Sequence, residues 1–222
     1  MRLLIVGAGG HGRVVADTAK AAGIDVYAFV DKEPQDDTVH GIPVYASLEE
    51  ALEDNSYEEP NFIVAISDNE ARAKTYAKMM ESGLKPAIVV HPLATVSDLA
   101  YVAPGTFVAA QAVVNADASV GENVIVNTAA VIEHDCVVGS HAFIAPLAVM
   151  CGNSRIGAYT FMSANATLIP NVKVGEDCLI TAGAVVTKSF KDRVRLMGMP
   201  AKSVETKSYD EVTDLIPEIR RS

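Results

Sequence analysis

The chain has 222 residues, half of them hydrophobic, so it holds enough apolar material for one large domain or two small ones, and general disorder is excluded. Aromatic residues make up only 6% and tryptophan is absent, so the core must be packed from aliphatic side chains, which favours strands. The net charge of −10 argues against nucleic acids and anionic membranes as partners, because both require a basic face on the protein.

No run of about 18 apolar residues occurs, and the first apolar stretch is interrupted at Gly7, too early for the core of a signal peptide. We therefore expect a soluble, cytoplasmic protein without membrane insertion. The three cysteines, Cys136, Cys151 and Cys178, show no CxxC spacing and no nearby His/Cys pair. We expect reduced, structural thiols and no metal site.

The first part of the chain alternates between strand and helix patterns. Strand patterns cover residues 2–6, 25–30, 42–45, 62–66 and 87–90, and helical patterns cover residues 13–22, 47–54 and 69–82. This alternation predicts a small, mostly parallel, Rossmann-like α/β domain over residues 1–93.

A glycine-rich loop connects the first strand to the first helix of this domain. Residues 7–12 satisfy GxGxxG, and Asp31 ends the next strand. Taken alone this is the dinucleotide fingerprint, but a nucleotide-sugar diphosphate requires the same backbone approach to a helix N-terminus. The domain is short for a complete dinucleotide fold, which makes NAD a less favoured ligand. His11 indicates a polar ligand, although a tight turn without any ligand is also compatible with this loop.

Residues 94–191 carry a six-residue repeat that holds its phase over sixteen hexads. A large aliphatic residue recurs at Val96, Val102, Val108, Val114, Val120, Val126, Ile132, Val138, Ile144, Met150, Ile156, Met162, Leu168, Val174, Ile180 and Val186. Four residues after each of them lies, with few exceptions, a small one. Neither helical nor two-residue strand periodicity produces a strict six, whereas short strands wound into stacked layers do. Sixteen hexads predict about five turns, each roughly 4.8 Å above the last.

His134 is the principal catalytic candidate of the repeat region. It lies between Glu133 and Asp135, two residues after the inward-facing Ile132 and two before the inward-facing Cys136, so it should project outward near a corner. A neighbouring carboxylate raises the pKa of an imidazole and can fix its tautomer, which suits a general base. The alternative is a surface histidine between two solvated acids.

The segment 192–222 ends the chain as a turn and a tail. Basic residues are concentrated around its start: residues 186–207 carry six basic and two acidic side chains, a net +4 against −14 for the remainder. This stretch could hold an anionic small ligand, or it could be a solubilising segment.

Together, several motifs resemble one family. They are residues 7–12 with Asp31, residues 65–70 (AISDNE), residues 127–136 (NTAAVIEHDC), residues 151–153 (CGN) and residues 198–202 (GMPAK). The chain resembles the sugar O- and N-acetyltransferases of the hexapeptide-repeat superfamily. These include the UDP-4-amino-sugar N-acetyltransferases of bacillosamine synthesis, the perosamine N-acetyltransferases and the sialic acid O-acetyltransferases. The resemblance implies a left-handed parallel β-helix with three hexads per triangular turn.

The resemblance also implies the site. His134 would be the general base, with Asp135 adjusting its pKa. The nucleotide sugar would contact Gly9, Gly10, His11, Asp31, Lys32, Ser67 and Asn127. Acetyl-CoA would lie along the edge of the coil and contact Phe143, Ala164, Ala182, Gly183 and Lys202. Members of the family are trimers with the cofactor between neighbouring coils, so we expect a homotrimer.

Three positions depart from the family pattern. Phe143 stands where the family often has a histidine that contacts acetyl-CoA, Lys32 stands where it commonly has Asp, and Ser67 where it commonly has Gly. The identity of the sugar and nucleotide is therefore less certain than the type of reaction.

The leading hypothesis is transfer of an acetyl group from acetyl-CoA to an amino, or alternatively a hydroxyl, group of a nucleotide-linked or acidic sugar. Transfer would be direct, because the nearest thiol, Cys136, occupies an inward position. An alternative of another class is an NAD- or nucleotide-binding sensor module on a non-catalytic coil. A zinc-dependent carbonic anhydrase would need three histidines, and His91, His134 and His141 offer little basis for such a set.

Overall fold

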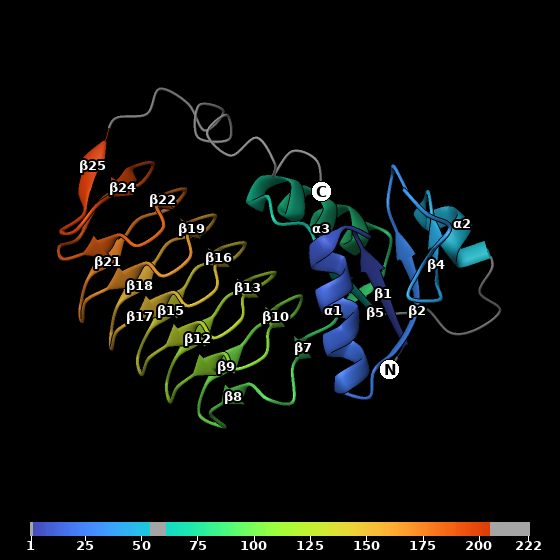
Figure 1. Cartoon of the computed structure of the whole chain (residues 1–222), viewed down its shortest axis with the longest axis horizontal. Helices are drawn as coiled ribbons and strands as arrows, with labels where there is room; N and C mark the ends of the chain where they lie inside the picture. Colours follow the sequence, from blue (N-terminus) through green and yellow to red (C-terminus); the bar gives the residue numbers. More distant parts are fainter. Residues whose placement is uncertain (1, 54–60, 205–222) are drawn as a thin grey trace.

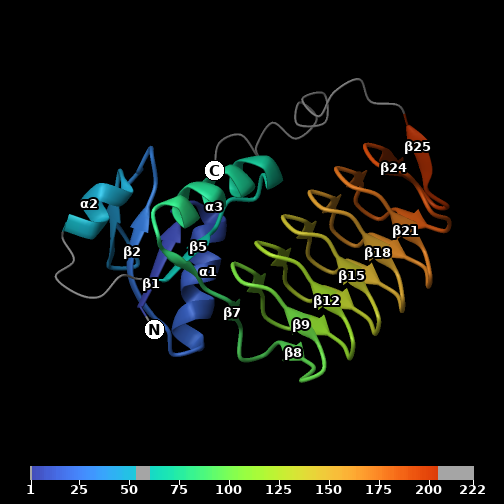
Figure 2. The same cartoon turned by 180° about the vertical axis from the view of Figure 1, so that it is seen from behind.

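The computed structural model describes residues 2–53 and 61–204 and consists of an α/β domain followed by a β-helix (Figures 1 and 2). Within these residues no helix has the length and apolar character needed to cross a membrane. The predicted tail lies outside the described residues from position 205 onward.

The N-terminal domain is built on a six-stranded sheet in the order β3-β4-β2-β1-β5-β6. All neighbouring strands are parallel except the β3–β4 pair. The strands are β1 (Arg2–Val6), β2 (Asp25–Val30), β3 (Thr38–Val39), β4 (Ile42–Tyr45), β5 (Asn61–Val64) and β6 (Lys85–Pro86). The helices are α1 (Gly10–Ala21), α2 (Leu48–Glu53) and α3 (Asn69–Glu81). The predicted parallel α/β domain is thus confirmed.

Side chains of the central strand divide between the two faces of this sheet, as a strand requires. Leu3 and Ile5 pack with α1 in a cluster that also includes Phe107 of the β-helix. Leu4 and Val6 pack on the opposite side with residues of α2 and α3. Helix α1 therefore lies between the sheet and the start of the coil.

Two predicted element boundaries were wrong. Helix α1 begins at Gly10, inside the glycine loop, rather than at residue 13. The predicted strand 87–90 does not form as one strand in the α/β sheet: β6 ends at Pro86, and β7 (Val89–Val90) pairs with β10 of the coil. The apolar run continues across the junction, so its pattern cannot show where one sheet ends and the next begins.

The second domain is the predicted left-handed β-helix, whose two-residue strands form three parallel sheets. Residues 18 apart pair across successive turns, for example Phe107 with Ile125 and Val113 with Val131, so three hexads make one turn. We call the sheets faces 1, 2 and 3. Face 1 contains β7, β10 (Phe107–Val108), β13 (Ile125–Val126), β16 (Phe143–Ile144), β19 (Phe161–Met162), β22 (Leu179–Ile180) and β24 (Arg195–Met197).

Faces 2 and 3 follow face 1 in each turn. Face 2 contains β8 (Thr95–Val96), β11 (Val113–Val114), β14 (Val131–Ile132), β17 (Val149–Met150), β20 (Thr167–Leu168) and β23 (Val185–Val186). Face 3 contains β9 (Tyr101–Val102), β12 (Ser119–Val120), β15 (Val137–Val138), β18 (Arg155–Ile156) and β21 (Lys173–Val174). The aliphatic hexad residues and the small residues four places later form the coil core, as predicted.

The coil continues past the point where the hexad pattern ends. Strand β24 pairs with β22, Leu196 opposite Ile180, and Phe190 forms a bridge with Val174. Leu196 is fully buried and joins the core. The chain then folds back as β25 (Lys202–Val204), antiparallel to β24. A spacing of 16 instead of 18 residues explains why a strict hexad search misses this last layer.

Candidate functional site

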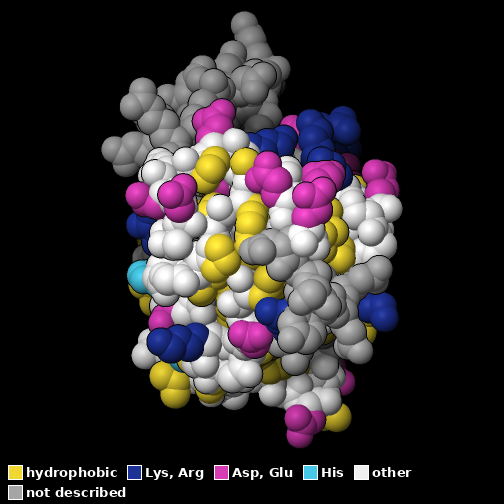
Figure 3. All heavy atoms as spheres, turned by 90° about the vertical axis from the view of Figure 1, so that its right-hand side faces the viewer, with side chains coloured by type: hydrophobic (Ala, Val, Ile, Leu, Met, Phe, Trp, Pro, Cys, Tyr) yellow, Lys and Arg dark blue, Asp and Glu magenta, His cyan; other side chains and the backbone are white. Residues whose placement is uncertain are grey.

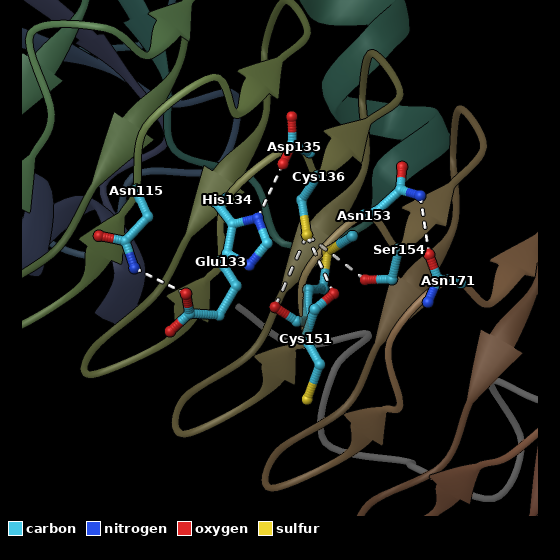
Figure 4. A network of polar contacts seen from close by, with 10 residues as sticks. Asn115, Glu133, His134, Asp135, Cys136, Cys151, Asn153, Ser154 and Asn171 are labelled. Carbon is cyan, nitrogen blue, oxygen red and sulfur yellow. Dashed lines mark hydrogen bonds and ion pairs between the residues drawn. The ribbon is translucent and has the colours of Figure 1, made fainter.

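His134 and Asp135 form a close pair on the corner between faces 2 and 3. His134 follows β14 by two residues, and its Nδ1 lies 2.7 Å from Oδ2 of Asp135 (Figure 4). Both side chains are more than half exposed, at 62% and 58%. Asp135 has a φ of 60°, a left-handed conformation that Asp tolerates better than most residues and that turns the corner.

Of the two acids that flank His134, it is Asp135 that contacts the ring. Glu133 instead accepts a hydrogen bond from Nδ2 of Asn115, one turn earlier, at 2.9 Å (Figure 4). The hydrogen bond that Asp135 accepts from the ring is the main cause that raises the pKa of His134; desolvation opposes it, and the charges of Asp135 and Glu133 add to the increase. Because an ionised carboxylate only accepts, Nδ1 must carry a proton, and in the neutral ring Nε2 carries the lone pair.

Gly152, one turn after His134, leaves the space that the imidazole occupies. A Cβ atom at Gly152 would lie 2.6 Å from Nε2 and 2.7 Å from Cε1 of His134. Any other residue would push the ring aside. The ring of His134, one turn earlier, therefore explains why the motif at residues 151–153 has a glycine at position 152.

The nearby cysteines are placed as structural residues. Cys136 is buried in the coil, where its Sγ lies 3.2 Å from the carbonyl oxygen of Cys151 and 3.4 Å from Oγ of Ser154. Burial is the main cause that raises the pKa of the Cys151 thiol. Cys136 is therefore not accessible as a nucleophile, and the raised pKa disfavours the thiolate of Cys151.

The glycine loop lies at the carboxyl end of β1, next to the loop that follows β5. Gly7 has a φ of 108°, and a Cβ there would lie 2.9 Å from the carbonyl oxygen of Ala65. Oδ2 of Asp31 accepts a hydrogen bond from the backbone N–H of Ala8 at 2.8 Å. Asp31, predicted to contact the substrate, thus also fixes the loop itself.

The glycine loop and the neighbouring loop lie where the sheet order reverses, with β2 and β5 on opposite sides of β1. Ligands of open parallel sheets bind at such a point. Gly9 is the N-cap of α1 and Gly10 its first residue, and Gly9 offers no side chain to cap that N-terminus. Ser67 lies in the second loop, and Lys32 is exposed after β2.

His11 points from this loop toward the coil. Its ring centroid is 5.3 Å from that of Phe107, edge to face, and 6.5 Å from that of Phe143. Nε2 is buried without a hydrogen-bond partner. Burial, with a smaller effect of the Arg72 charge, lowers the pKa of His11 to about 4, so the ring is neutral at pH 7. Its packing makes it part of the contact between the domains.

Most residues predicted to contact acetyl-CoA lie on other parts of the coil than His134. Ala164, Ala182 and Gly183 are exposed on the corner between faces 1 and 2, where Gly183 N–H donates to the carbonyl oxygen of Ala164 at 3.0 Å. Asn127, which was predicted to contact the nucleotide sugar instead, lies on the same corner, after β13. Lys202 is exposed on β25.

Phe143 is the exception among these residues. Its ring is 5% exposed and stacks on that of Phe161 at 4.6 Å, beneath the N-terminal domain. Its side chain lies in the packing between the domains, not on the exposed edge of the coil.

Within one chain, the structure brings together His134 with Asp135, and Ala164 with Ala182 and Gly183, but face 2 separates the two groups. Two grooves, of about 390 and 660 Å³, lie elsewhere, between α3 and the corner joining faces 3 and 1. Tyr159 lines both grooves. Among the described residues, no group of three or more His, Cys, Asp or Glu side chains could hold a metal ion.

The basic residues of the last coil layers are spread over its surface. Lys188 lies over the ring of Phe190 at 5.5 Å, and Arg193 lies 3.9 Å from Asp177. Figure 3 looks onto the opposite end of the molecule, the N-terminal domain, where acidic and basic side chains are also interspersed.

Sequence reasoning missed Arg72, on the first turn of α3. Its side chain is fully buried and hydrogen-bonds to the coil and to the loop after β5. The chain offers a weak signal for it, since Arg72 follows Asn69 by three residues on one helix face.

Comparison with known proteins supports the same family. Residues 2–79 match the family model described as PglD N-terminal domain. A histidine variant of perosamine N-acetyltransferase from Caulobacter crescentus, solved with CoA and GDP-perosamine, is 33% identical, with a TM-score of 0.88 over 93% of this chain and 98% of that one. The chain belongs to the hexapeptide-repeat family of sugar acetyltransferases.

Two further structures agree with this assignment. The acetyltransferase domain of PglB from Neisseria gonorrhoeae FA1090, in complex with acetyl coenzyme A, is 36% identical, with a TM-score of 0.86 over 91% of this chain and 98% of that one. WeeI from Acinetobacter baumannii AYE, at 21% identity and a TM-score of 0.77 over 92% and 100% of the two chains, shows the shared fold. The predicted family and fold are confirmed, and the CoA and acetyl-CoA in these relatives agree with the predicted acetyl donor.

Proposed function

We propose that this sugar acetyltransferase transfers the acetyl group of acetyl-CoA to an amino group of a nucleotide-linked sugar, with His134 as general base. The observation that carries the proposal is the His134–Asp135 pair, joined at 2.7 Å on an exposed corner of a coil shared with sugar N-acetyltransferases. The relatives' CoA, acetyl-CoA and GDP-perosamine complexes support the two substrate classes.

In the proposed reaction, Nε2 of His134 removes a proton from the amine as the amine nitrogen attacks the thioester carbonyl carbon. The carbon–sulfur bond breaks, and the imidazolium returns the proton to the leaving sulfur. Asp135 holds Nδ1 protonated throughout, so Nε2 is the atom that gains and loses the proton. No covalent enzyme intermediate is required, which agrees with the inward placement of Cys136.

We also propose that the active protein is a homotrimer. His134 lies on one edge of face 2, and Ala164, Ala182 and Gly183 lie on the other edge. The outer surface of face 2 between them carries the partly exposed valines Val113, Val131, Val149 and Val185. A neighbouring copy packed here would cover this apolar stripe and bring the acetyl-CoA edge of one chain to the histidine corner of another.

The activity is tested by measuring coenzyme A release with acetyl-CoA and a panel of UDP- and GDP-linked amino sugars, each paired with its 4-hydroxy counterpart. We expect release with an amino sugar and little with its hydroxyl analogue. A thermal-shift series with acetyl-CoA, UDP, GDP and NAD accompanies it, because a ligand at 100 times its Kd adds about 2.7 kcal/mol of stability. Stabilisation by NAD alone, with no acetyl transfer, would contradict the proposal and favour a sensor module.

A further inference from the structure

Arg72 joins the N-terminal domain to the coil through an unusually dense set of hydrogen bonds. Its Nε donates to the carbonyl oxygen of Asn123 at 3.0 Å, and one of its terminal nitrogens donates to those of His141 and Ala142 at 2.7 and 3.1 Å. These acceptors lie on two successive turns of the corner between faces 3 and 1. The guanidinium thus fixes the start of α3 against the coil.

The same guanidinium also holds the loop that follows β5. Its other terminal nitrogen donates to the carbonyl oxygens of Ile66 and Ser67 at 3.0 and 3.2 Å. Only arginine offers donors in several directions from one rigid plane, so only arginine can hold two backbone segments at a fixed separation in this way. A lysine, with a single nitrogen, could reach only part of these acceptors.

Asn69 forms a second link in parallel with the first. Its Nδ2 donates to the carbonyl oxygen of Tyr159 at 2.8 Å, one turn above His141, and its Oδ1 accepts from Arg72 at 2.7 Å. The two side chains together connect the first turn of α3 to three consecutive turns of the coil.

The loop held by Arg72 is one wall of the crevice where the sheet order reverses. It lies against the glycine loop, since a Cβ on Gly7 would be 2.9 Å from the carbonyl oxygen of Ala65 and 3.5 Å from Cγ1 of Ile66. A shift of the Ile66–Ser67 backbone would therefore change both the width of this crevice and its distance from the coil.

We infer that Arg72 is a positioning residue that sets the nucleotide-sugar crevice at a fixed place relative to the coil that carries acetyl transfer. This inference rests on the proposed function. Arg72 touches neither reacting atom; it acts through the backbone of Ile66 and Ser67. A misplacement of about 1 Å can cost 10²-fold in rate, so such a connection has kinetic consequences even when the fold survives.

The test compares Arg72→Lys and Arg72→Met with wild type in steady-state kinetics on the full chain. We expect KM for the nucleotide sugar to rise about tenfold or more and kcat to fall about 10- to 100-fold, with Arg72→Lys the milder change. KM for acetyl-CoA should stay within about twofold, because Ala164, Ala182 and Gly183 lie on another corner. Lys74→Met is the control: it removes only an exposed ion pair with Glu70 on the same helix.

A second variant and a binding measurement complete the test. If the Arg72 variants do not fold, Asn69→Ala replaces them; it removes the link to Tyr159 and should give the same KM pattern at a smaller scale. Titration calorimetry with UDP and GDP needs no turnover, so a weaker nucleotide affinity in Arg72→Lys supports the inference even if no acceptor sugar is found. Unchanged KM and nucleotide affinity, with only a lower yield of folded protein, would overturn it.

Discussion

At the scale of the residue, the chemistry depends on which acid contacts His134. The sequence places Glu133 and Asp135 symmetrically about the histidine, so spacing alone cannot choose between them. The structure distinguishes them because Asp135 takes the left-handed corner position, which turns its carboxylate to Nδ1, while Glu133 reaches back to Asn115. This corner geometry becomes visible only when successive turns are stacked.

We predict that Asp135→Asn lowers the apparent pKa of the acidic limb of the pH–rate profile and reduces the rate at neutral pH. Asp135 is the main cause of the raised pKa of His134, so its removal allows the imidazole to lose its proton at lower pH. The rate falls nonetheless, because the amide no longer holds Nδ1 protonated.

Glu133→Gln is the matched control for this prediction, since it removes an equal charge from the other side of His134. It should lower the apparent pKa of the acidic limb less and leave the rate at neutral pH close to that of wild type. A larger effect for Glu133→Gln than for Asp135→Asn would show that Glu133, and not Asp135, orients the imidazole.

The burial of Arg72 could not be predicted from the residues around it in the sequence. On the sequence it is one of several charged residues in a polar helix, and such residues are ordinarily solvated. Its burial depends on carbonyl groups of Asn123, His141 and Ala142, more than 50 residues away. No local pattern reports contacts of that kind.

At the scale of the element, the hexad repeat predicted the coil core but not the two ends of the coil. The period depends only on which side chains face inward, so it survives any variation of the exposed residues. The first layer, β7, keeps the 18-residue spacing, with Val90 opposite Val108, but it directly follows the apolar end of the α/β domain. Only the last layer, β24, breaks the repeat, because it closes a turn of 16 residues.

The corner between faces 3 and 1 contains a buried hydroxyl that we expect to matter for stability. Thr160 donates through Oγ1 to the carbonyl oxygen of Gly175 at 2.8 Å and accepts from the N–H of Cys178 at 3.1 Å. We predict that Thr160→Val destabilises the protein by about 1–3 kcal/mol, because the isosteric change leaves buried polar groups unpaired. Thermal and urea unfolding measure the loss.

Val124 provides the comparison, since it occupies the same place two turns earlier and is buried without a hydroxyl. Val124→Ala there should cost only the removed methyl groups and their cavity. A Thr160→Val protein as stable as wild type would show that the two backbone groups find other partners.

At the scale of the whole molecule, the contact between the domains should make stability depend on pH through His11. Its pKa is about 4 in the folded protein and near 6.5 when unfolded, so the unfolded chain binds more protons between these values. Stability is therefore full above pH 6.5 and falls as the pH falls toward 4, by up to about 3 kcal/mol at roughly 1.4 kcal/mol per pKa unit.

The variant His11→Phe should flatten this dependence while keeping an aromatic ring against Phe107. The melting temperature, measured between pH 7 and 4, tests this prediction. The control is His40→Asn at an exposed turn position, which should keep the wild-type dependence of melting temperature on pH. The pKa of His141 is also lowered, mainly by burial, so some slope should remain. An identical slope in His11→Phe and wild type would exclude the interface histidine as its source.

The proposed assembly predicts that a charge on face 2 separates the subunits. Val149→Lys should convert a trimer into monomers in light scattering and abolish most activity, because the ammonium would be placed against an apolar neighbour. Val137→Lys on face 3 is the matched control, since Arg155 stacks on this position and Lys173 on Arg155, so this part of face 3 is already charged. A wild-type monomer with full activity would refute the trimer.

The central claim, that His134 is the base of acetyl transfer, is tested most directly by the kcat of His134→Ala on a verified nucleotide sugar. His134 is exposed, so the variant should fold normally. The account predicts that kcat, followed by coenzyme A release at saturating substrates, falls roughly 10²–10⁴-fold while KM for acetyl-CoA stays nearly unchanged. A His134→Ala enzyme with the kcat of wild type would contradict it.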